Sequence, residues 1–280
     1  MAIEIEGEMV EVFDAHTHLN QRPSQSGSRI ESAGTSGFTP RKGYTDVMMI
    51  EDMDEAGVDK VLAFSGASPS TDYSAKNDGV AEAIKKYPDR IMGFCWINPH
   101  FGPEASVKAI DRYIKELGFR GIKLNPPIDW FYPTNEALLF PIMDKAREYK
   151  VPVLFHCGDS VMASPTLVAE LASHYTDVPI ILGHMGLFDG VKQATIAAKK
   201  ADNLFLETSI CTWMDHFFGP AVKSVGPSKL VYGSDHPYNP FGLEIDKLVK
   251  YAPRYTGLTT ADLKLILSGN IRKILSCHWC

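Results

Sequence analysis

Near the start of the chain stands VFDAHTHL, residues 12–19, an apolar run that ends in a His-x-His pair. On a β-strand, residues two apart point to the same face. His16 and His18 would therefore project side by side from the end of one strand. Two imidazoles held in this way favour a transition-metal site, most often a zinc site, although two histidines in a surface turn would produce the same letters.

After residue 45 the chain alternates helical patterns with short apolar runs. The helical patterns cover 46–56, 75–87, 104–117, 134–149, a helix that starts after Ser164-Pro165, 189–200 and 214–224. The apolar runs between and after them cover 60–65, 91–97, 119–125, 151–157, 179–184, 204–208 and 230–235. Gly57 stands just past the first helix, and Ser164 before Pro165 is typical of an N-cap. Continuous apolar runs are typical of parallel strands that are buried on both faces.

Together with residues 12–19 these runs make eight strands separated by helices, which predicts an α/β fold, a (β/α)8 barrel. An open doubly wound sheet is the main alternative, but no glycine-rich dinucleotide fingerprint follows the first strand. Residues 20–44, rich in Ser, Gly and Pro, make a long first βα loop, either a lid or a plain connection. Residues 260–267 and 270–275 add C-terminal helices. We expect a single domain over 1–280.

Composition restricts the classes of partner. The net charge is −6, and we see no basic stripe that would indicate a nucleic-acid partner. No apolar stretch reaches the ~20 residues of a membrane-spanning helix, and the acidic N-terminus is unlike a signal or transit peptide. Five scattered cysteines argue against a disulfide framework. We therefore expect a cytoplasmic protein that acts on a small molecule. The oligomeric state stays open, a homo-oligomer included.

Five polar residues that can bind a metal stand where the predicted strands end: His16, His18, His156, His184 and Asp235. In a barrel the carboxyl ends of the strands meet on one face, and active sites lie there. A histidine deep in an apolar strand would otherwise need a hydrogen-bond partner. The five positions together therefore predict a metal site on this face.

These motifs resemble those of the amidohydrolase superfamily, in the branch often called amidohydrolase family 2. That branch includes metal-dependent hydrolases and aminocarboxymuconate-semialdehyde decarboxylase. The matching segments keep the family's order and are DAHTH (14–18), GIKL (121–124), FHCG (155–158), LGHMG (182–186), YGSDHP (232–237) and GNIRKIL (269–275). The resemblance covers nearly the whole chain and implies a barrel that holds a divalent metal ion.

The resemblance implies that His16, His18 and His156 are neutral imidazole ligands and that Asp235 is a carboxylate ligand. A divalent metal brings the pKa of its bound water from 15.7 to roughly 7. Asp235 could then take the water's proton and pass it to the leaving group. His184 would be the second catalytic residue, near the open coordination position, where it would polarise the substrate, deprotonate the water or bind the ion. The alternative for His184 is a buried histidine bonded to a neighbouring strand.

Other residues are expected to contact the substrate. Lys123 and Asn125 on the fourth strand could both face the barrel interior. In other branches of the superfamily a lysine on this strand is carbamylated and bridges two metals, but the family-2 pattern goes with one metal. We interpret Lys123 as a structural or substrate-facing cation. Four further contacts are expected from loops on the catalytic face: Trp130, Tyr132, Trp213 and Arg22.

We therefore expect a metal-dependent hydrolase in which a metal-activated water attacks a carbonyl carbon of a small amide, ester or lactone. The alternative on the same site is a lyase, a non-oxidative decarboxylase or hydratase of an unsaturated or aromatic acid. Arg22, Arg29 and Arg41 could bind the carboxylate of such a substrate. A third hypothesis is a non-catalytic metal-binding barrel. One divalent ion is expected, Zn²⁺ before Mn²⁺, and the identity of the substrate does not follow from the sequence.

Overall fold

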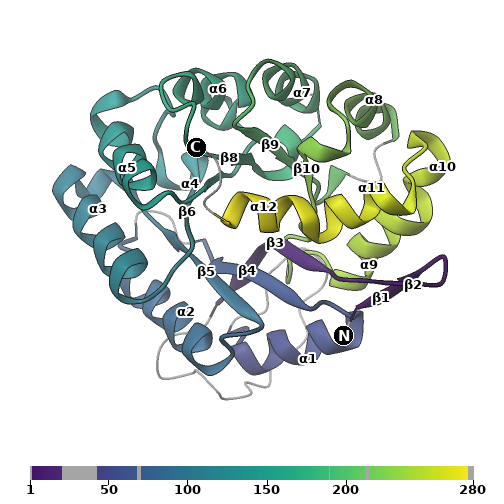
Figure 1. Ribbon diagram of the computed structural model, residues 1–280. Coiled ribbons are helices and arrows are strands. Elements are labelled where there is room, and N and C mark those ends of the chain that lie inside the picture. The colour runs from purple at the N-terminus through teal and green to yellow at the C-terminus, as the bar shows by residue number, and fades with distance from the viewer. Residues whose placement is uncertain (1, 21–42, 68–70, 189, 212–214, 277–280) are drawn as a thin grey trace.

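The computed structural model describes residues 2–20, 43–67, 71–188, 190–211 and 215–276. Eight parallel strands pair in chain order and helices surround them, so the predicted barrel is confirmed (Figure 1). The strands are β3 (Phe13–Leu19), β4 (Lys60–Ser65), β5 (Ile91–Trp96), β6 (Gly121–Leu124), β7 (Val153–Phe155), β8 (Ile180–Leu182), β9 (Leu204–Glu207) and β10 (Leu230–Val231). Residues of β7, β8 and β9 are buried throughout, as continuous apolar runs require.

The first and last strands close the barrel through the chain that follows β10. The amide of Ala15 donates to the carbonyl of Tyr232 at 3.0 Å, and the amide of Asp235 donates to the carbonyl of His16 at 2.8 Å. An open doubly wound sheet would leave these two edges far apart. The same bonds bring Asp235 beside the His-x-His pair, although 219 residues separate it from His16 along the chain.

The outer helices follow the expected pattern. They are α1 (Asp46–Ala56), α2 (Ser74–Lys86), α3 (Pro103–Ile110), α5 (Glu136–Tyr149), α6 (Pro165–Ser173), α7 (Gly190–Lys200) and α8 (Asp215–Val225). Gly57 ends α1 with φ 75°, and the Ser164 hydroxyl accepts from the amide of Thr166 at the start of α6. The helix expected over 104–117 continues from α3 into a π-helical stretch, Asp111–Glu116. Over the described ranges no helix is long and apolar enough to cross a membrane.

A β-bulge interrupts β3 at the start of the His-x-His pair. Its register against β4 shifts between Asp14 and Thr17. Ala15 belongs to a small apolar cluster inside the barrel, yet the ring of His16 also lies inside, 5.1 Å from the ring of Phe64. Simple alternation would have placed the neighbours Ala15 and His16 on opposite faces. The extra residue thus lets both histidines point into the barrel, while Phe13 and Ala15 at the start of the strand still pack in the apolar core of the barrel.

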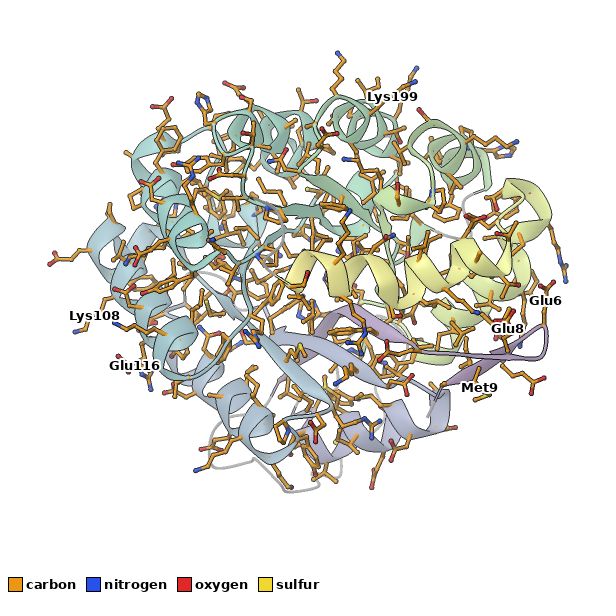
Figure 2. All side chains as sticks on the ribbon, in the orientation of Figure 1. Glu6, Glu8, Met9, Lys108, Glu116 and Lys199 are labelled. Atoms are coloured by element: carbon orange, nitrogen blue, oxygen red, sulfur yellow. The ribbon has the colours of Figure 1, made fainter. Side chains whose placement is uncertain are left out.

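Segments at the two ends of the chain cover the end of the barrel where the strands begin. The last helices are α9 (Phe241–Asp246), α10 (Pro253–Thr256), α11 (Thr260–Lys264) and α12 (Asn270–Leu275). Ile271 and Ile274 of α12 pack with Phe13, the first residue of β3. An N-terminal hairpin, β1 (Ile3–Ile5) with β2 (Glu8–Val10), was not expected from the sequence. Its Glu8 pairs with Lys264 of α11 beside the C-terminal helices (Figure 2).

Candidate metal centre

His16, His18 and Asp235 meet at the carboxyl ends of β3 and β10. The Nε2 atoms of His16 and His18 lie 3.3 Å and 3.1 Å from the same oxygen, Oδ1 of Asp235. All three side chains are buried. A tetrahedral ion with ligands at about 2.0–2.1 Å has ligand–ligand edges of about 3.3 Å. The two distances to Asp235 match such edges, and all three ligand atoms lie within 4.8 Å of one another.

On the side of each ring that faces away from Asp235, a hydrogen bond shows which ring nitrogen is available to bind a metal. His16 Nδ1 lies 2.6 Å from Glu207 Oε2, and His18 Nδ1 lies 3.1 Å from the carbonyl oxygen of Ser65. A carboxylate or carbonyl oxygen accepts, so each Nδ1 carries the hydrogen. In the neutral rings both Nε2 lone pairs then face a carboxylate oxygen. Three acceptors directed at one point fit a bound cation.

The electrostatics of the two rings differ. Burial lowers the pKa of His18 to about 4, so its ring is neutral near pH 7. For His16, burial and Lys123 act to lower the pKa, but the carboxylates of Glu207 and Asp235 outweigh them and raise it. A proton on His16 Nε2 would serve only one of the two contacts to Asp235. The contact between His18 and Asp235 would still lack a proton, which a divalent ion would replace.

His184 belongs to a second, adjoining group with His16 and Glu207. Its ring centre lies 4.7 Å from that of His16, and its backbone amide donates to Glu207 Oε2 at 3.0 Å. Its backbone has φ 55°, in the left-handed region that residues other than glycine rarely adopt. Burial lowers the pKa of His184 well below its ordinary value. A neutral imidazole therefore stands beside the three-residue cluster.

His156 lies at the edge of the site rather than among the converging atoms. Its Nδ1 lies 3.1 Å from His184 Nε2, and its Nε2 lies 3.1 Å from Asp159 Oδ1. Among the described residues, His156 is in neither group whose ligand atoms all lie within 4.8 Å of one another. Its assignment as a metal ligand stays a prediction, because the ring would have to leave these partners to reach the cluster.

Lys123 places a buried cation against the cluster. Its Nζ lies 3.5 Å from His16 Nε2 and over the rings of Phe64 and Trp96, 4.5 Å and 5.8 Å from their centres. Within the described parts of the chain it forms no ion pair with a carboxylate. Burial lowers the pKa of Lys123 to about 8, although Asp235 and Glu207 act to raise it. The ammonium is therefore held by ring faces and a histidine lone pair.

This low pKa predicts a pH-dependent stability. Below pH 8 the folded and unfolded chains both carry the Lys123 proton, so the full cost of burying the charge remains. Between about pH 8 and 10.5 the unfolded chain binds more protons, so the unfolding free energy rises with pH. Relative to Lys123→Met, metal-free wild type should gain up to about 3 kcal/mol over this range. Denaturant titrations of both proteins at pH 7.5 and 10.5 would measure the difference, and a constant gap would contradict a charged, buried Lys123.

The remaining residues expected at the substrate are dispersed. The side chain of Asn125 caps α4 (Pro126–Asp129) by accepting from the amide of Ile128. Trp130 and Tyr132, on the loop after β6, are 67% and 50% exposed. Arg22 and Trp213 lie outside the described residues, as do Arg29, Arg41 and most of the long first loop. Among the described members of this set, Lys123 alone lies against the cluster.

Glu207 and Ser209 were not singled out from the sequence. Glu207 is fully buried at the end of β9, where it contacts both His16 and His184. The available signal was a lone acidic residue that ends an apolar run, LFLE at 204–207. Such a carboxylate needs partners that only the neighbouring strands can supply.

Comparisons with known proteins agree with the motifs. The family described as Amidohydrolase matches residues 13–276. Gamma-resorcylate decarboxylase of Polaromonas sp. is 23% identical, over 87% of this chain and 94% of that protein. The 2-keto-4-carboxy-3-hexenedioate hydratase of Sphingobium sp. is 22% identical, over 58% of this chain and 57% of that protein. Both curated relatives are lyases by name.

Solved structures show the same barrel. The 5-carboxyvanillate decarboxylase of Novosphingobium aromaticivorans, complexed with manganese and 4-hydroxy-3-methoxy-5-nitrobenzoic acid, superposes with a TM-score of 0.70. The match covers 98% of each chain at 19% sequence identity. At this identity the likeness concerns the fold, and the bound ion and acid are properties of that protein.

Proposed function

We propose, from the premise that this chain belongs to the amidohydrolase family, that it is a metal-dependent lyase that decarboxylates an aromatic or unsaturated carboxylic acid without an oxidant. The observation that carries the proposal is the convergence of His16, His18 and Asp235 beside the cation of Lys123. The sequence alone favoured a hydrolase and kept the lyase as its alternative. The named activities of the two curated relatives support that alternative better.

His16, His18 and Asp235 would hold the ion, and His156 would join them if its ring turned away from Asp159. Two nitrogens with one carboxylate oxygen suit Zn²⁺ and Mn²⁺ alike. Manganese in the Novosphingobium decarboxylase supports Mn²⁺ as strongly as ligand chemistry supports Zn²⁺. When bound, such an ion would act as a Lewis acid toward an anionic oxygen of the substrate.

The chain's own residues would supply charge and proton transfer. In decarboxylation the bond between the ring carbon and the carboxyl carbon breaks, carbon dioxide leaves, and that ring carbon gains one proton. Lys123 would attract the anionic acid, since within the described residues it has no carboxylate partner. Asp235 belongs to the cluster and His184 borders it, and these are the two groups to which we assign proton transfer. The buried rings of Phe64 and Trp96, which lie beside Lys123, would exclude competing water.

Hydration of a double bond is the second candidate, because one curated relative is named for it. It needs the same anion site and the same proton transfer, with water added in place of carbon dioxide lost. Hydrolysis of a lactone or ester, which the sequence analysis favoured, is the alternative reaction from a different enzyme class.

A substrate panel tests the proposal. Manganese-loaded and zinc-loaded protein would be incubated with hydroxybenzoic acids, unsaturated tricarboxylic acids and lactones of similar size. We expect one carbon dioxide and one decarboxylated arene per turnover from at least one hydroxybenzoic acid. Addition of water to an unsaturated acid without release of carbon dioxide would assign a hydratase. Turnover restricted to lactones or esters would overturn the lyase proposal in favour of a hydrolase.

A further inference from the structure

We propose that Glu207 and Ser209 form a positioning pair that fixes which ring nitrogen of His16 and of His184 carries the hydrogen. The inference rests on the proposed metal site for its chemical meaning. Its geometry rests only on hydrogen bonds at the end of β9, where both residues are fully buried. One carboxylate and one hydroxyl would thereby assign the chemical roles of two histidines from different strands.

The carboxylate of Glu207 is surrounded by donors. Its Oε2 accepts from the amide of His184 at 3.0 Å and from the Ser209 hydroxyl at 2.9 Å, and its Oε1 accepts from the amide of Ser209. Backbone amides only donate, so both carboxylate oxygens act as acceptors. Oε2 also lies 2.6 Å from His16 Nδ1. We expect that nitrogen to donate as well.

The opposite side of His16 leads to the same assignment. Lys123 Nζ lies 3.5 Å from His16 Nε2, and an ammonium can only donate. Asp235 Oδ1, 3.3 Å from the same Nε2, can only accept, so Nε2 presents its lone pair when a metal ion lies between the two, and Nδ1 then carries the hydrogen. With Glu207 behind the ring, this tautomer leaves Nε2 free for an ion on the side of Asp235. Buried carboxylates behind metal-binding histidines act in this way in many metal sites.

A count of hydrogens extends the assignment to His184. The Ser209 hydroxyl has one hydrogen, which goes to Glu207 because a carboxylate only accepts. Ser209 Oγ also lies 2.7 Å from His184 Nδ1, so this nitrogen must be the donor in that bond. His184 then carries its hydrogen on Nδ1. Its Nε2 is left as the basic atom, directed toward His156 and away from β9.

Gly233 leaves the space that this arrangement needs. A Cβ at position 233 would lie 2.4 Å from Glu207 Oε1 and 2.8 Å from the Cβ of His16. Both are distances that real Cβ atoms essentially never show. The neighbouring strand end thus accommodates the carboxylate only because it has no side chain there.

Thr208 provides a matched control between the two positioning residues. Its hydroxyl oxygen is buried and has no hydrogen-bond partner among the described residues. Thr208→Val keeps the shape and removes only this unused hydroxyl. Glu207→Gln places an amide at His16 whose NH2 group can force the ring to reverse its tautomer. Ser209→Ala removes the hydroxyl that links Glu207 to the ring of His184.

The test measures ring tautomers and metal affinity in the whole chain of residues 1–280. Long-range ¹H–¹⁵N spectra of metal-free and zinc-loaded protein would identify the protonated nitrogen of each histidine, and competition with a chelator would measure the dissociation constant for Zn²⁺. In wild type we expect Nδ1–H on His184 without metal and Nδ1–H on His16 with zinc. Glu207→Gln should weaken zinc binding by about 10–100-fold. Ser209→Ala should change the His184 signals alone, and Thr208→Val should change neither.

Two outcomes would overturn the positioning role: Nε2–H on His184 in wild type, or unchanged zinc affinity in folded Glu207→Gln. The wild-type spectrum decides the question even if Glu207→Gln fails to fold. Inactivity toward every acid in the panel would leave these tautomers as expected and would count against the proposed reaction only. The two inferences therefore fail separately.

Discussion

Asp235→Asn is expected to lower kcat by ~10²–10⁴-fold, the usual contribution of a positioned acid–base group. Asparagine keeps the size and one oxygen that can face the histidines, but it removes the negative charge and the basicity. His16 and His18 should still retain the ion, although less tightly. The loss should appear mainly in kcat, because substrate binding does not require the proton transfer. Steady-state kinetics on the acid identified in the panel, with metal content measured in parallel, would check this.

Asp129→Asn is the matched control for the loss of a buried carboxylate. Asp129 also follows a barrel strand and is buried, and it accepts hydrogen bonds from Trp96 Nε1 and the hydroxyl of Tyr73. In asparagine the remaining oxygen can accept from Trp96 Nε1 and the NH2 group can donate to the Tyr73 hydroxyl, so both contacts persist and kcat should stay near the wild-type value. Near-normal kcat in Asp235→Asn at full metal occupancy would exclude Asp235 as the proton-transfer group. His184, whose neutral ring stands beside the cluster, would then be the leading candidate.

The barrel could be predicted because its signals are local. Each strand is an apolar run, and each helix ends or begins at a residue with a direct structural role, as at Gly57 and Ser164. The grouping of His16, His18 and Asp235 also followed, because parallel strands bring their carboxyl ends to one face. These inferences needed only periodicity and the topology of a closed parallel sheet.

The other features of the site depend on how separate strands lie against one another, which no single stretch of sequence shows. The bulge in β3 appears only as a register shift against β4. Glu207 on β9 contacts His16 on β3, although 191 positions separate the two residues along the chain. The partners of His156 depend on how the loop at Asp159 folds back. The choice between lyase and hydrolase was also beyond the motifs, because the same ligands serve both reactions.

Purified protein is expected to contain about one divalent ion per chain and to lose it in His16→Ala or His18→Ala. Each change removes one of the two imidazole donors that face Asp235 Oδ1, and a cluster reduced to one imidazole and one carboxylate cannot hold the ion against a chelator. Activity should disappear with the metal. Elemental analysis by mass spectrometry, after dialysis against a weak chelator, would measure the content.

His174→Ala is the control for this experiment, because His174 is exposed after α6 and its ring lies against Phe140. It should keep the wild-type metal content. Unchanged metal content in both His16→Ala and His18→Ala would contradict the site itself. Two ions per chain would instead favour a carbamylated Lys123, since its Nζ lies 3.5 Å from His16 Nε2, close enough for a carbamate to reach a second ion. Lys123→Met would then reduce the count, whereas with one ion per chain it should leave the count unchanged.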